Sequence, residues 1–195
     1  MIALGAAVAL AGLLAPRAAM AAEDNKEADA AAPSSVHLAA RAWAGAGARS
    51  LYDVYFAGGD AHVGVGVDAP SGTYGLSASF FGGVIEGGLP ALQVGFGFYL
   101  EWPVGPLRFG FEPRIGYIGI ERVTTERQFG AYTFGVAGHA TVDLIRRDGF
   151  AFAVGIEPTA EVAAALGNDG ASSDGAAPLL GATAIVQVRY RYAER

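Results

Sequence analysis

Between Ala91 and Glu121 the chain alternates apolar residues with small or polar ones around a turn at Pro103–Pro106. Successive side chains of a β-strand point to opposite faces, so this pattern predicts a β-hairpin with one wholly aromatic and aliphatic face. The opposite face carries glycine, arginine and glutamate. Such a ribbon suits a barrel wall whose apolar face meets lipid and whose small, polar face lines a narrow lumen. The apolar face comprises Leu92, Val94, Phe96, Phe98, Leu100, Trp102, Leu107, Phe109, Phe111, Ile115 and Tyr117.

The composition favours an exterior in contact with lipid. Only 16% of the 195 residues are charged, against about 25% in typical globular domains, whereas a soluble domain needs a charged exterior. Without a leader that contains Arg17, 12 basic residues face 19 acidic ones. This balance disfavours non-specific nucleic-acid binding, which needs clustered Lys and Arg. The absence of cysteine excludes disulfides, thiolate catalysis and cysteine metal sites.

The N-terminal region predicts a leader and a linker. Residues 2–15 form an apolar run of signal-peptide length, followed by a small-residue site at Ala19-Met20-Ala21. We therefore expect a signal peptide over 1–21, with a retained anchor helix as the alternative. The polar, alanine-rich residues 22–35 predict a disordered linker, and residues 36–195 would form the barrel.

The remaining chain predicts an all-β, closed antiparallel up-and-down transmembrane β-barrel of about eight strands. Short turns alternate with longer links, which are expected near 49–60, 121–128 and 167–178. Outer-membrane barrels have short periplasmic turns and longer external loops, and an even strand number returns both termini to the periplasm. The predicted strands are about 36–47, 61–68, 73–86, the two arms of the hairpin, 129–145, 150–165 and 179–192.

Two prolines interrupt this pattern. Pro113 and Pro158 fall inside the predicted fifth and seventh strands, where each removes a ladder hydrogen bond. Both follow a glutamate, so our hypothesis is a β-bulge at each proline. The inward glutamate carboxylate would then accept hydrogen bonds from the backbone N–H groups that the bulge leaves unpaired.

The inward face is polar and nearly balanced in charge. Charges enclosed by a barrel wall must pair, because unpaired burial costs several kcal/mol. We therefore predict an ion-pair network that plugs the lumen, with His37 nearby; a wet channel is the alternative. The predicted members are Arg41, Glu101, Arg108, Glu112, Arg114, His139, Asp143, Glu157, Glu161, Arg189 and Arg191.

Catalytic, metal and cofactor signals are weak. His62, His139, Ser77 and Ser79 with the glutamates could supply a serine, histidine and acid set, but no motif singles them out. The three histidines lack paired ligand spacing. No catalytic residue, metal site or cofactor is predicted.

Three aromatic residues are placed as a membrane-interface belt requires. Trp102 lies beside a short turn, and Tyr190 and Tyr192 lie near the end of the last strand. The alternative is that aromatics simply favour strands.

The apolar leader, the alternating strands, the turn rhythm and the final strand VQVRYRY resemble the small eight-stranded outer-membrane proteins with OmpA-like or OmpX-like barrels. The resemblance covers about residues 36–192. Members usually end on an aromatic residue, whereas Tyr192 is followed by Ala193-Glu194-Arg195. We expect no peptidoglycan-binding domain after the barrel, in contrast to full-length OmpA-type proteins. The resemblance implies a monomer in the outer membrane of a Gram-negative envelope, surrounded by lipid and handled by periplasmic chaperones and the barrel-assembly machinery.

From these features we expect a non-enzymatic barrel with a structural or surface-interaction role, in which external loops contact an unidentified surface ligand. Two alternatives stay open. One is an outer-membrane enzyme that modifies lipid A acyl chains. The other is a periplasmic lipocalin-like binder, whose apolar face would turn inward around a ligand.

Overall fold

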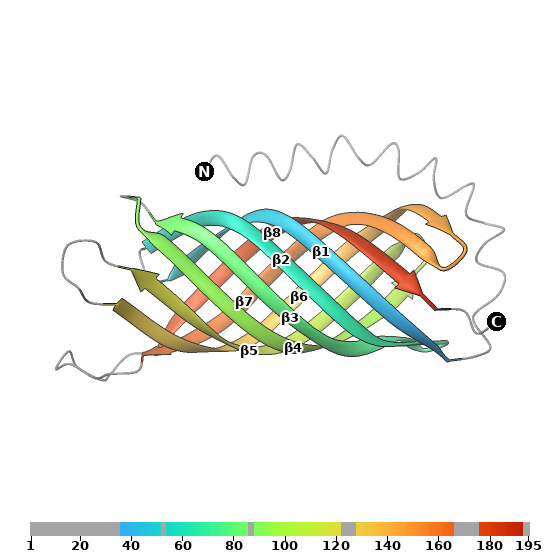
Figure 1. The fold of residues 1–195 in the computed structure, drawn as a ribbon, viewed down its shortest axis with the longest axis horizontal. Coiled ribbons are helices and arrows are strands. Elements are labelled where there is room, and N and C mark those ends of the chain that lie inside the picture. The colour runs from blue at the N-terminus through green and yellow to red at the C-terminus, as the bar shows by residue number, and fades with distance from the viewer. Residues whose placement is uncertain (1–35, 52–53, 86–87, 122–127, 166–175, 193–195) are drawn as a thin grey trace.

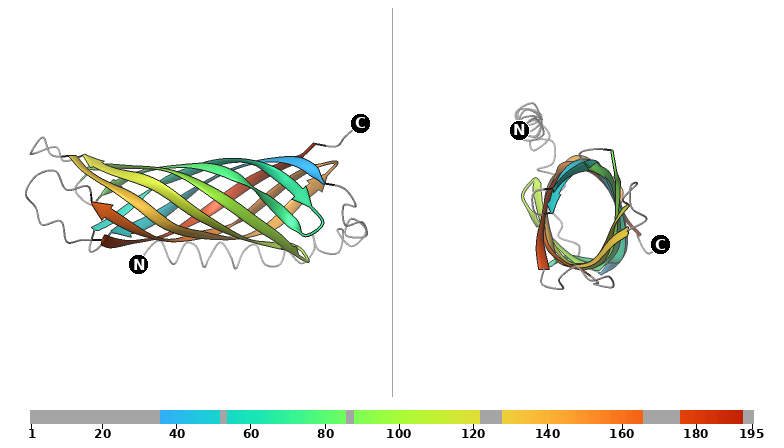
Figure 2. Two further views of the ribbon diagram at one scale, coloured as in Figure 1. Left: turned by 90° about the horizontal axis from the view of Figure 1, so that it is seen from below. Right: turned by 90° about the vertical axis from the view of Figure 1, so that its left-hand side faces the viewer.

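The computed structural model describes residues 36–51, 54–85, 88–121, 128–165 and 176–192. Each strand pairs antiparallel with its sequence neighbours, and β1 pairs with β8, so the sheet closes into a barrel (Figure 1). Seen along its axis, the barrel has an oval cross-section (Figure 2). The predicted fold class of eight antiparallel strands is confirmed. The strands are β1 (His37–Leu51), β2 (Val54–Ala69), β3 (Gly72–Ile85), β4 (Pro90–Val104), β5 (Leu107–Glu121), β6 (Gln128–Arg147), β7 (Phe150–Ala165) and β8 (Ala176–Arg191).

The first two strands are longer than predicted. A long link was expected over 49–60, but Arg49 pairs with Phe56 in the β1–β2 ladder. That expectation is wrong because Leu51 and Phe56 point into the lumen while Tyr55 is exposed on the outside, so large apolar residues lie on both faces of this segment and hide the strand alternation. The predicted signal peptide and linker, residues 1–35, lie outside the described residues, as do 122–127 and 167–175 of the two later predicted links.

Three tight turns lie at one end of the barrel, which we name the turn end; the opposite end is the loop end. Ala69 pairs with Gly72, Val104 with Leu107 and Arg147 with Phe150, so each turn has two residues. Gly105 and Gly149 adopt positive φ of 60° and 85°, which the mirror-image turns of two-residue hairpins require. The first residues of β1 and the last of β8 lie at this end too (Figure 1). The predicted rhythm of short turns is confirmed.

The two faces of the wall have opposite chemistry. Large apolar side chains are exposed along all eight strands, whereas arginines and acids are buried inside. The predicted orientation of the apolar row, outward, is therefore confirmed. Trp102, Tyr190 and Tyr192 are exposed near the turn end, and Tyr117 and Tyr132 are exposed toward the loop end. Among the described residues, no helix has the length and apolar character needed to cross a membrane.

Neither proline causes a bulge. β5 keeps one register with β4 on both sides of Pro113, and its ladder with β6 continues through that residue. β7 behaves in the same way at Pro158. The bulge hypothesis is wrong because a strand residue directs its N–H and C=O toward only one neighbour, so each proline weakens one ladder and requires no extra residue. The register shifts instead between Asp143 and Ile145 of β6.

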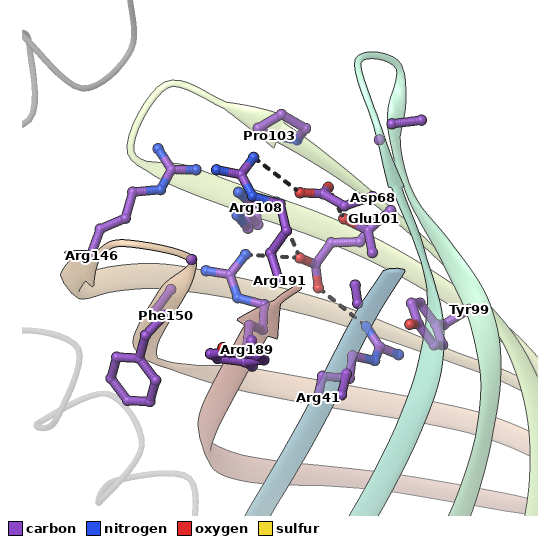
Figure 3. Close-up of a pocket in the computed structure, with 18 of the residues that line it drawn as sticks. Arg41, Asp68, Tyr99, Glu101, Pro103, Arg108, Arg146, Phe150, Arg189 and Arg191 are labelled. Atoms are coloured by element: carbon purple, nitrogen blue, oxygen red, sulfur yellow. Dashed lines mark hydrogen bonds and ion pairs between the residues drawn. The ribbon is translucent and has the colours of Figure 1, made fainter. Parts of the chain in front are cut away.

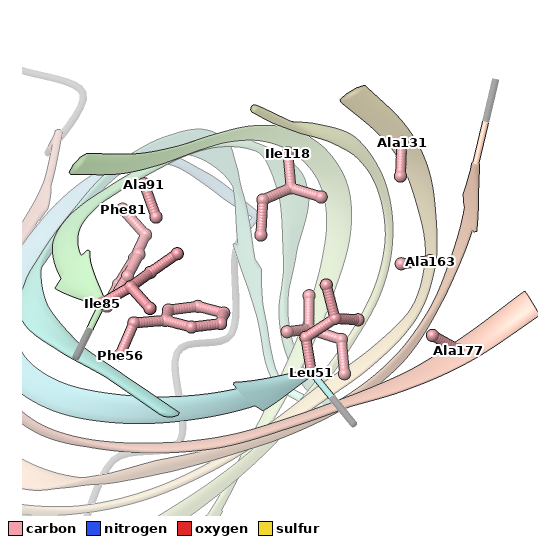
Figure 4. Close-up of a cluster of buried hydrophobic side chains, with 10 residues drawn as sticks. Leu51, Phe56, Phe81, Ile85, Ala91, Ile118, Ala131, Ala163 and Ala177 are labelled. Atoms are coloured by element: carbon pink, nitrogen blue, oxygen red, sulfur yellow. The ribbon is translucent and has the colours of Figure 1, made fainter. Parts of the chain in front are cut away.

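Apolar side chains fill the lumen at the loop end (Figure 4). Phe56 and Phe81 meet edge to face, with ring centroids 5.9 Å apart, and aliphatic side chains surround them. We name this group the loop-end apolar cluster. Its members are Leu51, Phe56, Phe81, Ile85, Ala91, Ile118, Ala131, Ala163, Ala177 and Leu179.

Candidate functional site

Next to the loop-end apolar cluster, Arg49 anchors a polar layer. Its guanidinium lies 4.2 Å from the ring centroid of Phe81, and its Nη2 lies 2.6 Å from Oδ2 of Asp60. Arg49 also donates to Gln93, which donates in turn to Glu161 over 2.6 Å. Cation, amide and carboxylates thus contact one another across the lumen.

A second layer joins β1, β2, β5 and β7 around Glu157. Trp43 Nε1 donates to this carboxylate over 2.7 Å, and Arg114 Nη2 lies 3.0 Å from its other oxygen. The ring of His62 stacks on Trp43 with centroids 4.4 Å apart, and its Nε2 lies 2.7 Å from Oδ1 of Asp60. Residues remote in sequence therefore meet at the barrel axis.

A third layer lies toward the turn end, around Glu101. This carboxylate pairs with Arg41 at 3.2 Å, Arg189 at 3.1 Å and Arg108 at 3.5 Å. Arg41 also stacks on Tyr99, with its guanidinium carbon 3.2 Å from the ring centroid. A single carboxylate thus holds three guanidiniums.

The structure brings most of the predicted interior residues together. Arg191 lies apart, at the mouth of the barrel, where it pairs with Asp68 at 3.6 Å. His139 is buried, but neither of its ring nitrogens has a hydrogen-bond partner among the described residues. The predicted residues that meet in ion pairs are Arg41, Glu101, Arg108, Glu112, Arg114, Asp143, Glu157, Glu161 and Arg189.

Sequence reasoning missed Arg49 and Asp60 as interior residues, because both fell in the link expected over 49–60. A usable signal was present in the strand period. Arg49 continues the odd-numbered inward positions that begin at Arg41, and Asp60 precedes His62 by two residues, which places both on one face of a strand.

Gly110 makes room for His139. A Cβ built on Gly110 would collide with the imidazole ring of His139, which pairs with it across the β5–β6 ladder. We expect Gly110→Ala to lower the free energy of unfolding by about 1–3 kcal/mol through overpacking. Urea unfolding in phospholipid vesicles measures this loss. In a His139→Ala background the collision disappears, so an equal loss in both backgrounds would refute the steric explanation.

The arrangement does not assemble a catalytic triad. Ser79 pairs in register with His62, yet Nδ1 of His62 has no hydrogen-bond partner among the described residues, and its Nε2 already faces Asp60. A serine nucleophile needs its hydroxyl within hydrogen-bond reach of the base. This geometry therefore gives no support to the alternative of an enzyme.

Asp60, His62 and Glu157 bring three donor atoms within 4.8 Å of one another, a grouping that sequence spacing did not reveal. Their donors already have partners. Arg49 neutralises Asp60, and Arg114 and Trp43 both contact Glu157. The protein's own cations therefore balance these carboxylates without a metal ion.

No protein-family model and no curated protein sequence matches the chain. Among solved structures, Neisserial surface protein A is similar, with a TM-score of 0.54 and 8% identity over 81% of this chain and 99% of that one. The attachment invasion locus protein Ail of Yersinia pestis, solved with the heparin analogue sucrose octasulfate, gives a TM-score of 0.40 and 9% identity over 80% and 99%. A structure from the de novo design of transmembrane β-barrels gives 0.28 and 16% over 79% and 95%. The similarity to Neisserial surface protein A and the closed eight-stranded sheet confirm the resemblance to small eight-stranded outer-membrane barrels at the level of the fold.

Proposed function

We propose that the chain is an integral outer-membrane barrel with a closed interior and a non-enzymatic, structural or surface-interaction role carried by the loop end. The observation that carries this proposal is the division of the wall into an apolar exterior and an enclosed, ion-paired interior. A rigid barrel that holds variable connections is a common platform for recognition, because loops tolerate change without loss of the scaffold.

The exterior of the barrel supports its insertion into a lipid bilayer. Exposed Phe, Val, Leu and Ile side chains surround the barrel, and exposed aromatics lie toward both ends, as lipid-facing bands and aromatic girdles require. The outward position of these side chains argues against the lipocalin-like alternative, which needs them inside around a ligand. In water, a monomer that exposes such a large apolar surface would aggregate.

The interior supports a closed barrel. An eight-stranded barrel is just wide enough for its own side chains to fill. Here the loop-end apolar cluster occupies one end, and layers of ion pairs occupy the middle. Arg41 stacked on Tyr99 and paired with Glu101 continues the filling toward the turn end. A hydrated ion would have to break these contacts to cross.

We expect the purified full-length protein to give no stepwise conductance in planar bilayers. Its insertion is checked by gel migration of heated and unheated samples, since a closed barrel resists unfolding until boiled. A conducting porin in the same membranes serves as the positive control. Stable, ion-selective current steps from the heat-modifiable protein would contradict the closed interior and favour the wet channel.

A further inference from the structure

A cavity of about 680 Å³ opens at the turn end of the barrel (Figure 3). Strand ends and the tight turns after β2 and β6 form its rim, and Arg41 with Tyr99 lies at its inner end. We name this cavity the turn-end vestibule. The proposed function does not use it, because it lies at the end opposite the loops.

Arginine dominates the vestibule. The lining residues include six arginines against only three acids, Asp68, Glu101 and Asp148. This surplus is local, since the whole chain carries a formal net charge of −6. Concave walls of low dielectric concentrate such a field and draw anions inward. The arginines are Arg41, Arg108, Arg146, Arg147, Arg189 and Arg191.

The carboxylates near the vestibule are shared among several guanidiniums. Arg108 and Arg189 both contact Glu101, and both also contact Asp143. Arg146 approaches the same aspartate, at 3.9 Å. Each guanidinium carries a full charge and five N–H donors. Arg108 and Arg189 share both of these carboxylates with other guanidiniums, so the two arginines retain charge and donor capacity for an anion.

We propose that the turn-end vestibule binds a multiply charged phosphate group. Guanidinium forks bind phosphate through paired, charge-assisted hydrogen bonds. A pyrophosphate or a phospholipid headgroup presents several phosphate oxygens in a volume that this cavity accommodates. The loop-end apolar cluster occupies the opposite end of the lumen, so we expect the ligand to enter and leave through the turn end, an expectation that rests on the proposed closed interior.

Isothermal titration of the full chain with pyrophosphate in a non-ionic detergent tests this site. The variant is Arg146→Gln with Arg191→Gln, and the two wild-type side chains are 36% and 41% exposed. Their acidic partners tolerate the loss, because Asp143 still contacts Arg189 and Asp68 is partly exposed to solvent. We expect one saturable site in the wild type and an affinity at least about tenfold weaker in the variant, the loss of roughly one charge-assisted hydrogen bond. Heat-modifiable gel migration shows that both proteins are folded.

The matched control is Arg122→Gln with Arg127→Gln, which makes the same charge change in the sequence between the end of β5 and the start of β6. The control should bind pyrophosphate as the wild type does. An equal loss in the control would overturn the proposal, because binding would then follow net charge and not the vestibule.

A second titrant distinguishes a soluble phosphate ligand from a lipid headgroup. Phosphatidic acid, whose phosphomonoester headgroup carries up to two negative charges, is added to the same micelles, with phosphatidylcholine as the reference lipid. Binding of pyrophosphate supports a soluble ligand, whereas binding of phosphatidic acid alone, weakened in the vestibule variant, supports a lipid headgroup. Binding of neither overturns the proposal, as does citrate binding as tightly as pyrophosphate. These outcomes are independent of conductance and of the proposed role at the loop end.

Discussion

Replacing Glu101 by glutamine is expected to lower the free energy of unfolding by about 3–5 kcal/mol, the usual effect of removing one partner of a buried ion pair. The side chain of Glu101 is only 1% exposed and faces Arg41, Arg108 and Arg189. Glutamine keeps the shape of the side chain but removes the charge that holds three guanidiniums together. Urea unfolding in phospholipid vesicles, followed by tryptophan fluorescence, measures the change.

Asp148→Asn is the matched control for this variant. It also converts one acid to its amide, but Asp148 is exposed in a turn, and its φ of 34° is one that asparagine tolerates. We expect its stability to stay close to that of the wild type. If the two variants lost equal stability, the enclosed ion pairs would not be a structural element of the barrel.

The sequence allowed the faces of the wall to be predicted where large side chains display the strand period. In β4 and β5, phenylalanine and leucine alternate with glycine and charged residues, so the inward and outward sets were separable from the pattern alone. In β1 and β2, alanine and glycine occupy both faces between Trp43 and Arg49, and large apolar residues lie on both faces from Leu51 to Phe56. Neither stretch shows a contrast between faces, so the strand ends there could not be located.

The ion pairs themselves could not be predicted, because they depend on register and strand tilt around the whole barrel. Trp43 and Glu157 hydrogen-bond across 114 positions of sequence, and no local pattern links them. The sequence identified which side chains face inward but not which of them meet. His139 illustrates the difference, since it is inward as predicted yet has no hydrogen-bonded ring nitrogen among the described residues.

The outward row offers the strongest test of membrane insertion. Phe96 lies near the middle of β4 and is 64% exposed, whereas Val104 ends the same strand at the turn end and is 56% exposed. If hydrocarbon surrounds the barrel, Phe96→Arg should lower the free energy of unfolding by about 2–4 kcal/mol and Val104→Arg by only about 0–1 kcal/mol, because the penalty for arginine falls from the bilayer midplane to the interface.

Urea unfolding of both variants in vesicles of defined thickness measures this difference in depth. Both substitutions add the same charge to similarly exposed positions of one strand, so net charge and strand propensity do not separate them. Only a surrounding bilayer separates the two variants, because its hydrocarbon core lies farthest from water at mid-barrel. An arginine side chain near the turn end is long enough to place its guanidinium in water. Equal losses at Phe96 and Val104 would therefore mean that the apolar row does not face a bilayer.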